Sequence, residues 1–336
     1  MPQAAPAPPL APSPRLGFAV RVVGKPSLRS HQPPRKAGAH LSVNLVYLRD
    51  ILAYLHPLDI RFYRLSSSLL PIFAGSEGTS EPVLQRALRQ VQECAAELCL
   101  VAERVRAQGV RLTMHLGHHV VPGHASEALA CRSLEEIEAQ ALLLELLTEP
   151  SEGVLVVHVG GASGERAALE RFACRYLALS PRARLRLAVE HDTAGFSLGA
   201  LLWLHQQCGI PVVFDALHYH LHNPEHFPLD LALGLALATW PAHRRPKVHL
   251  STARTEAHLL PGRRGSPSRV VPPRTGQHAD FVAVADLVAL LEAARGVGPF
   301  DVMLEAKAGD LALLRLRSEL TRLAPELANR CHTLAF

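Results

Sequence analysis

IPVVFDALHYHLHNP, residues 210–224, contains the pattern that decides the fold. Its apolar run, residues 212–214, is long enough for a buried strand and too short for a helix. Asp215 and His218 follow directly, and both are side chains that bind metal ions. An apolar strand that ends in such ligands is typical of an α/β barrel, in which the chemistry sits on the loops after the strands.

The same design recurs along the chain. Strand-like runs are expected at 16–20, 59–68, 110–115, 153–161, 185–190, 212–214, 246–251 and 301–305. Helical patterns are expected at 44–56, 80–107, 133–147, 165–177, 197–208, 229–237, 281–294 and 310–323, and an irregular loop at 256–277. Alternation of this kind favours parallel strands joined by crossover helices. Eight repeats predict an α/β protein with a single TIM (β/α)8 barrel. An open doubly wound sheet is the alternative, although no glycine-rich dinucleotide fingerprint supports it.

Composition supports one large domain. The chain has 336 residues, 48% of them hydrophobic, with a net charge of +5 that is compatible with a polyanionic partner. We expect a disordered Pro-rich arm at 1–14, the barrel at 15–325 and a C-terminal tail at 326–336. The six cysteines form no CxxC pair and are interpreted as reduced. No signal peptide or bilayer-length apolar run is found, so a cytoplasmic location is expected.

Candidate metal ligands stand at or shortly after the strand ends. They are His115, His158, Glu190, Asp215, His218, His249, His278 and Glu305. In a parallel barrel these ends meet at one face, where imidazoles and carboxylates would bind two or three divalent ions, with Glu190 bridging. Taken singly, each histidine can also be a hydrogen-bonded structural residue. Lys247 and His249 lie on the same face of their strand. A lysine beside metal ligands is expected to contact phosphate or to be modified to a carbamate. The alternative is a surface lysine at the start of a strand.

The ordered motifs resemble the UV damage endonuclease family. They are RLSSSLLP (64–71), LTMHLGHH (112–119), VLVVHVGGASGE (154–165), LAVEHD (187–192), VVFDALHYHLHNP (212–224), PKVHLS (246–251), QHADF (277–281) and DVMLEAK (301–307). The resemblance implies a TIM barrel related to endonuclease IV with a multinuclear site, usually for Mn²⁺, with Zn²⁺ or Mg²⁺ as alternatives. It further implies incision of damaged double-stranded DNA immediately 5′ of pyrimidine dimers and 6-4 photoproducts, leaving 3′-hydroxyl and 5′-phosphate ends.

The resemblance assigns a role to each residue that matches a family motif. The resemblance implies one ion held by His115, His158 and Glu190, a second completed by Asp215, His249 and Glu305, and a third held by His218 and His278, with Asp280 near it. Glu190 and Lys247 are the implied catalytic residues, and Lys247 matches a lysine that family members can carboxylate. His118 and His119 stand where the family has a Gln–aromatic pair that probes the duplex. This chain also departs after Pro71, where IFAGSEG lacks the family's histidine.

Other residues are expected to contact DNA. Phe18 and Tyr63 are candidates for lining a lesion pocket, or are core residues. Phosphate contacts are expected from Arg244, Arg245, Arg263, Arg264, Arg269 and Arg274. We expect a monomer that acts at the nucleoid and has no membrane partner. The competing hypotheses are an abasic-site endonuclease, a metal-dependent sugar isomerase on the same scaffold, and a non-catalytic DNA-binding barrel.

Overall fold

The structure is a computed structural model, and it describes residues 14–33, 38–72, 81–161, 165–262 and 267–331. The arm predicted at 1–14 therefore lies almost wholly outside the described residues. Among the described segments, none of the helices combines the length and the apolar character needed to cross a membrane.

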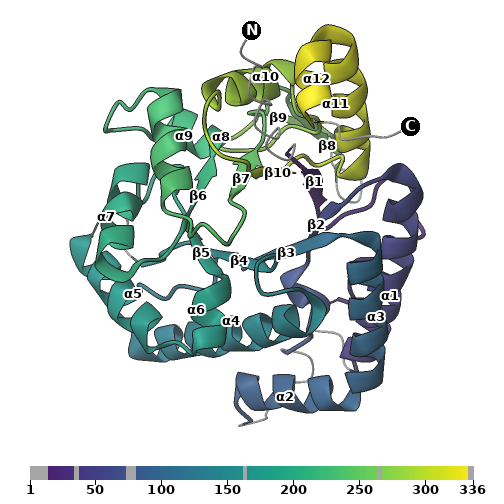
Figure 1. The fold of residues 1–336 in the computed structure, drawn as a ribbon, viewed down its shortest axis with the longest axis vertical. Helices are drawn as coiled ribbons and strands as arrows, with labels where there is room; N and C mark the ends of the chain where they lie inside the picture. The colour runs from purple at the N-terminus through teal and green to yellow at the C-terminus, as the bar shows by residue number, and fades with distance from the viewer. Residues whose placement is uncertain (1–13, 34–37, 73–80, 162–164, 263–266, 332–336) are drawn as a thin grey trace, which may run out of the picture.

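Eight parallel strands close into a barrel, which confirms the predicted TIM fold (Figure 1). Around the barrel they run in the order β1-β10-β7-β6-β5-β4-β3-β2. Their bounds are β1 (Leu16–Ala19), β2 (Phe62–Leu65), β3 (Arg111–His115), β4 (Val154–Val157), β5 (Leu187–Glu190), β6 (Val212–Asp215), β7 (Lys247–Leu250) and β10 (Asp301–Leu304). Because all eight strands run in the same direction, the residues at their carboxyl ends share one rim.

Helices surround the strands (Figure 1). The α-helices are α1 (Leu41–Leu55), α2 (Val83–Glu93), α3 (Ala95–Gln108), α4 (Glu127–Leu147), α5 (Arg166–Ala178), α6 (Pro181–Arg186), α7 (Leu198–Cys208), α8 (Ala216–Leu221), α9 (Leu229–Ala238), α10 (Val284–Ala293), α11 (Asp310–Leu323) and α12 (Pro325–Cys331). Short 3-10 turns occupy His56–Leu58 and Ser67–Leu69. The predicted tail thus begins with a helix, which packs on α11 and buries Ala328.

Two predicted helices have other bounds than expected. The helix expected over 80–107 is two helices, α2 and α3, which meet at Cys94; the break lets α2 pack on α4 while α3 also packs on α1. The helix expected to begin at Ser133 begins six residues earlier. Ser133 therefore lies inside α4, where its hydroxyl donates to Leu129 O (2.8 Å) and accepts from Val121 N (2.9 Å). It ties the loop after β3 to α4.

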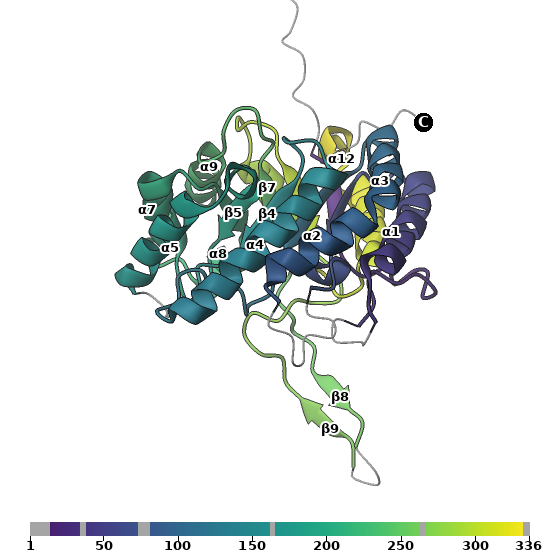
Figure 2. The ribbon, with the colours of Figure 1, turned by 90° about the horizontal axis from the view of Figure 1, so that it is seen from below.

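The loop expected to be irregular over 256–277 contains an antiparallel pair, β8 (His258–Leu260) and β9 (Arg269–Val271). Figure 2 shows that this pair extends well away from the body of the barrel.

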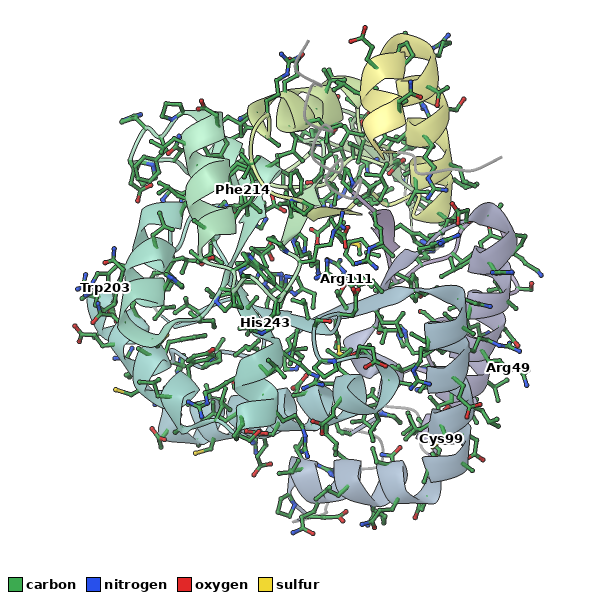
Figure 3. The ribbon with its side chains drawn as sticks, in the orientation of Figure 1. Arg49, Cys99, Arg111, Trp203, Phe214 and His243 are labelled. Atoms are coloured by element: carbon green, nitrogen blue, oxygen red, sulfur yellow. The ribbon has the colours of Figure 1, made fainter. Side chains whose placement is uncertain are left out.

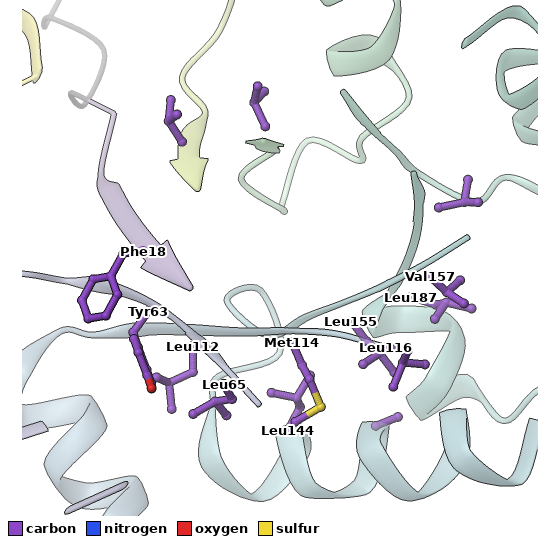
Figure 4. Close-up of a cluster of buried hydrophobic side chains, with 14 of the residues drawn as sticks. Phe18, Tyr63, Leu65, Leu112, Met114, Leu116, Leu144, Leu155, Val157 and Leu187 are labelled. Atoms are coloured by element: carbon purple, nitrogen blue, oxygen red, sulfur yellow. The ribbon is translucent and has the colours of Figure 1, made fainter. Parts of the chain in front are cut away.

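The hydrophobic core lies between the strands and the helices, and it includes Phe18 and Tyr63 (Figure 4). Their rings make an edge-on contact with centroids 5.2 Å apart, and the Tyr63 hydroxyl donates to Val20 O (2.6 Å). Phe18 is 0% exposed and Tyr63 is 1% exposed, so the expectation that they line a lesion pocket is wrong. They face the helix layer, where burial of aromatic surface stabilises the fold.

The amino-terminal end of the barrel is closed by charged side chains. Asp301 is fully buried and accepts hydrogen bonds from Arg15 Nε (2.9 Å) and Arg111 Nη1 (2.7 Å). Arg245 Nε makes an ion pair with the other oxygen of Asp301, at 2.7 Å. Figure 3 shows Arg111 inside the ring of strands. Arg244 is also buried. Phosphate contacts by Arg244 and Arg245 were therefore a wrong expectation, because both lie at the end opposite the ligand-rich rim.

Candidate metal centre

Three overlapping groups of candidate ligands meet at the carboxyl ends of the strands. Within each group one ligand atom per residue lies within 4.8 Å of the others. The groups are His115, His158 and Glu190; Glu190, Asp215 and His218; and Asp215, His249 and Glu305. Seven of the eight candidates from the sequence are thus brought together. His278 is outside the groups, and its Nδ1 lies 3.7 Å from Glu305 Oε2.

Glu190 is at the centre of the cluster, at the end of β5. Its Oε2 is 2.7 Å from His115 Nε2 and its Oε1 is 2.7 Å from His249 Nδ1. Burial alone would raise the pKa of this carboxyl group, but the neighbouring imidazoles of His249 and His115 hold the pKa well below its usual range. The carboxylate therefore stays ionised, and each of its oxygens contacts a different imidazole.

His158 follows β4 and is oriented by a carboxylate that sequence reasoning missed. Its Nδ1 lies 2.7 Å from Asp192 Oδ1, and its Nε2 lies 3.6 Å from Glu190 Oε2. Burial by itself lowers the pKa of His158, but the hydrogen bond to Asp192 and the two negative charges outweigh it and raise the pKa to about 9. Carboxylates that hold the outer nitrogen of a metal-binding histidine are common. The LAVEHD motif placed Asp192 two residues after Glu190, which was the available signal.

Asp215 ends β6 and begins α8. Its Oδ1 accepts from His218 N (2.8 Å), so it caps the helix that carries His218. Its Oδ2 is buried and has no hydrogen-bond partner in the described part of the chain, and the same holds for Nε2 of His249. Burial raises the pKa of Asp215 to about 6. A buried polar atom without a hydrogen bond destabilises the fold unless a ligand binds it. The imidazole and carboxylate groups gathered here suit a first-row divalent ion. The residues therefore fit a metal centre.

Two further residues hold this arrangement and were not singled out from the sequence. His191 is fully buried; its Nε2 accepts from Asp215 N (3.0 Å), and burial lowers its pKa to about 3, so the ring is neutral. Arg64, near the end of β2, makes an ion pair with Glu305 and contributes to the lowered pKa of that carboxyl group against the effect of burial. The sequence alone does not show these roles, because both depend on contacts across the barrel.

Lys247 is fully buried, so its reading as a surface lysine is wrong. It lies on β7 two residues before His249, and its Nζ has no hydrogen-bond partner among the described residues. Burial, assisted by the charge of Arg64, lowers its pKa well below the ordinary value for a lysine. The amine is therefore favoured in its uncharged, nucleophilic form.

The loop after β3 carries two exposed histidines, one of which contacts the centre. The ring of His118 stacks on that of His158, with centroids 5.3 Å apart and planes 17° apart. His119 Nε2 is 3.0 Å from Oε2 of Glu136 on α4. Arg269 and Arg274 are exposed beyond β7, whereas Arg263 and Arg264 lie outside the described residues. Asp280 pairs with Arg254 (3.3 Å) and belongs to none of the ligand groups.

Comparison with known proteins places these features in a family. The family model described as UV-endonuclease UvdE matches residues 30–332. A UV DNA damage endonuclease of Bacillus velezensis is 28% identical over 289 residues, covering 84% of this chain and 83% of its own. A UV-damage endonuclease of Neurospora crassa is 33% identical over 217 residues, covering 61% of this chain and 31% of its own.

Solved structures share the fold. The crystal structure of SacUVDE has a TM-score of 0.74 at 24% identity, covering 92% of this chain and 99% of that one. Endonuclease IV from Thermus thermophilus has a TM-score of 0.54 at 16% identity, covering 92% and 100%. Because the family model matches most of the chain and the ligand-bearing strand ends converge on one rim, this protein belongs to the UV-endonuclease UvdE family and is a nuclease that acts on UV-damaged DNA.

Proposed function

We propose that the protein nicks the DNA backbone immediately 5′ of UV photolesions, both pyrimidine dimers and 6-4 photoproducts, and leaves 3′-hydroxyl and 5′-phosphate ends. The observation that carries this proposal is the sharing of ligands between the three groups, in which Glu190 and Asp215 each belong to two. Shared carboxylates are the feature that a site for neighbouring ions requires in phosphodiester hydrolysis.

The members of those groups would hold two or three divalent ions, for which Mn²⁺ is the first candidate. His278 would join His218 in holding the third ion. Bound ions would neutralise charge on the phosphate and make an attacking water more acidic. The chain's own residues have separate tasks. Glu190 stays ionised between two imidazoles, Asp192 holds His158 in one orientation, and Arg64 keeps Glu305 ionised. No side chain needs to act as a nucleophile.

Lesion recognition is assigned to the rim. His118 is exposed and stacks on His158, and His119 is exposed on the same loop, so this loop is assigned the task of probing the damaged base pair. Damaged bases stack and pair poorly, and they cost less to unstack than intact ones. Arg274 with Arg269 supplies charge for phosphate contacts on the same side. The action of a monomer on duplex DNA at the nucleoid stays a prediction.

The test is incubation with an end-labelled duplex that carries one thymine dimer, with Mn²⁺, Mg²⁺, Zn²⁺ or a chelator. We expect one cut on the 5′ side of the dimer, with ends that a polymerase extends and a ligase seals. Glu190→Gln and His158→Ala should abolish nicking, while the exposed His56→Ala should not. A protein that leaves the dimer duplex intact with every ion but cuts an abasic duplex would refute the assignment in favour of the abasic-site alternative.

A further inference from the structure

The β8–β9 ribbon has an apolar face that no part of the described chain covers. In its register Leu259 pairs with Val270, and Leu260 pairs with Arg269. Directly paired residues point to the same side of an antiparallel ribbon. Leu259 is 67% exposed and Val270 is 70% exposed, so one side presents two bare aliphatic side chains. Leu260, on the other side next to Arg269, is 43% exposed.

The stem of the ribbon is joined to the candidate metal centre. Arg254 N donates to Gln277 O (2.8 Å), and Ala279 N donates to Thr252 O (2.9 Å). Between these bonds Ala253 forms an antiparallel bridge with His278, a predicted ligand. The ribbon leaves β7 at its carboxyl end, so it projects from the ligand-bearing rim (Figure 2). Its position relative to the site is therefore set by backbone hydrogen bonds.

The charge of this segment identifies its partner. Residues 257–279 contain four arginines and no aspartate or glutamate. A basic segment with aliphatic side chains at its centre is complementary to DNA, whose phosphates attract arginine while its base edges accept apolar contacts. Groove width then favours one of the two grooves. The major groove, about 12 Å wide, admits a two-stranded ribbon in undeformed DNA, whereas the minor groove, about 6 Å wide, takes such an element only when the duplex is deformed.

We infer that the β8–β9 ribbon lies in the major groove of the duplex beside the lesion, with Leu259 and Val270 against the base edges and Arg269 and Arg274 toward the phosphates. This inference rests on the proposed function. It assigns the ribbon the task of holding the duplex in register over the metal centre while the loop of His118 and His119 tests the damaged position.

The test compares Leu259→Ser/Val270→Ser with a matched control, Leu100→Ser/Leu177→Ser, which removes two exposed leucines from α3 and α5. Binding to a dimer duplex is measured by fluorescence anisotropy, and nicking is measured in parallel. We expect the ribbon variant to bind about tenfold more weakly, with unchanged metal content and unchanged kcat at saturating DNA. The control should stay within twofold of the wild type. Methyl green, which occupies the major groove, should compete with the wild type more strongly than netropsin, which occupies the minor groove.

The outcomes separate this inference from the proposed function. If the wild type binds through the ribbon but does not nick, the proposed cleavage fails and the ribbon contact stands. If the wild type nicks and the ribbon variant binds and nicks within twofold of it, the ribbon contact is wrong and cleavage stands. Stronger competition by netropsin than by methyl green also overturns the major-groove assignment.

Discussion

Asp192 shows how one carboxylate outside the ligand set can tune the centre. It fixes Nδ1 of His158 at 2.7 Å, which leaves Nε2 to face Glu190. In the metal-free protein the pKa of His158 is about 9, above the ordinary 6.5. The protonated ring therefore stabilises the metal-free fold fully below pH 6.5, and this stabilisation is lost as pH rises through about 9. Metal binding has to displace that proton.

The first prediction concerns this pair. Asp192→Asn should weaken Mn²⁺ binding about 10–100-fold, because the histidine loses its charged partner. Wild-type affinity should rise between pH 7 and pH 9, and the variant's rise should shift to lower pH because its His158 pKa falls. Calorimetric titration in two buffers of different ionisation enthalpy counts the released protons. The exposed Asp230→Asn is the control; equal affinity of Asp192→Asn and wild type at every pH would contradict the role.

The second prediction concerns Lys247. Its buried, uncharged amine has no hydrogen-bond partner among the described residues and should add to carbon dioxide, forming a C–N bond and releasing a proton, so that a carbamate replaces the neutral amine. With ¹³C-bicarbonate, NMR should show one carbamate signal that Lys247→Arg lacks. Lys247→Ala should lose activity about tenfold or more, and short-chain carboxylic acids should restore part of it. Absence of the signal, with activity indifferent to bicarbonate, would exclude the modification.

At the scale of elements, the segment after β1 is held by the start of α11. Asp310 is fully buried and accepts from Val23 N (2.6 Å), Gly24 N (3.1 Å) and the Tyr54 hydroxyl (2.6 Å). Burial, together with the Asp310 hydrogen bond and charge, raises the pKa of Tyr54 to about 12. One carboxylate thus joins α1, α11 and the chain that follows the first strand.

The third prediction follows from this junction. Asp310→Ala should lower the free energy of unfolding by about 3 kcal/mol, because two backbone amides lose a charged acceptor. Tyr54→Phe should cost only about 1 kcal/mol, because it removes one hydrogen bond and leaves the carboxylate bound to the amides. Urea unfolding measures both variants. Equal losses would mean that the amides find another acceptor when Asp310 is removed.

At the scale of the whole molecule, the two ends of the barrel have separate tasks. One rim gathers ligands, and the other is closed by Asp301 among guanidinium groups. Buried pairs of this kind are costly to break, since removing one partner leaves uncompensated charge.

The fourth prediction tests that division. Asp301→Asn should lower the free energy of unfolding by about 3 kcal/mol or more, because it removes the nearer carboxylate of the fully buried Arg111 and leaves only Glu152, at 3.8 Å. Mn²⁺ affinity and kcat should remain within twofold of the wild type. Thermal unfolding and calorimetric metal titration give the two quantities. A large loss of metal affinity at unchanged stability would show that the two ends are coupled.

The sequence by itself determined the closed barrel and the gathering of ligands at its rim. Alternating apolar runs and helical patterns specify parallel strands, and polar residues placed at the strand ends must then meet. Residue type also named Glu190, Asp215 and the histidines as candidate ligands, because few side chains bind divalent ions; their role in metal binding stays a prediction.

Only the tertiary structure decided which side of each strand faces inward and which distant groups touch. Phe18 and Tyr63 face the helices, whereas Lys247 and His249 face the interior, and period-two alternation alone cannot distinguish these two buried sides. Contacts such as Arg64 with Glu305 and Asp192 with His158 join separate strands and loops, so they exist only once the barrel is closed. The ribbon was missed because its strands are only three residues long and their aliphatic side chains Leu259, Leu260 and Val270 are exposed.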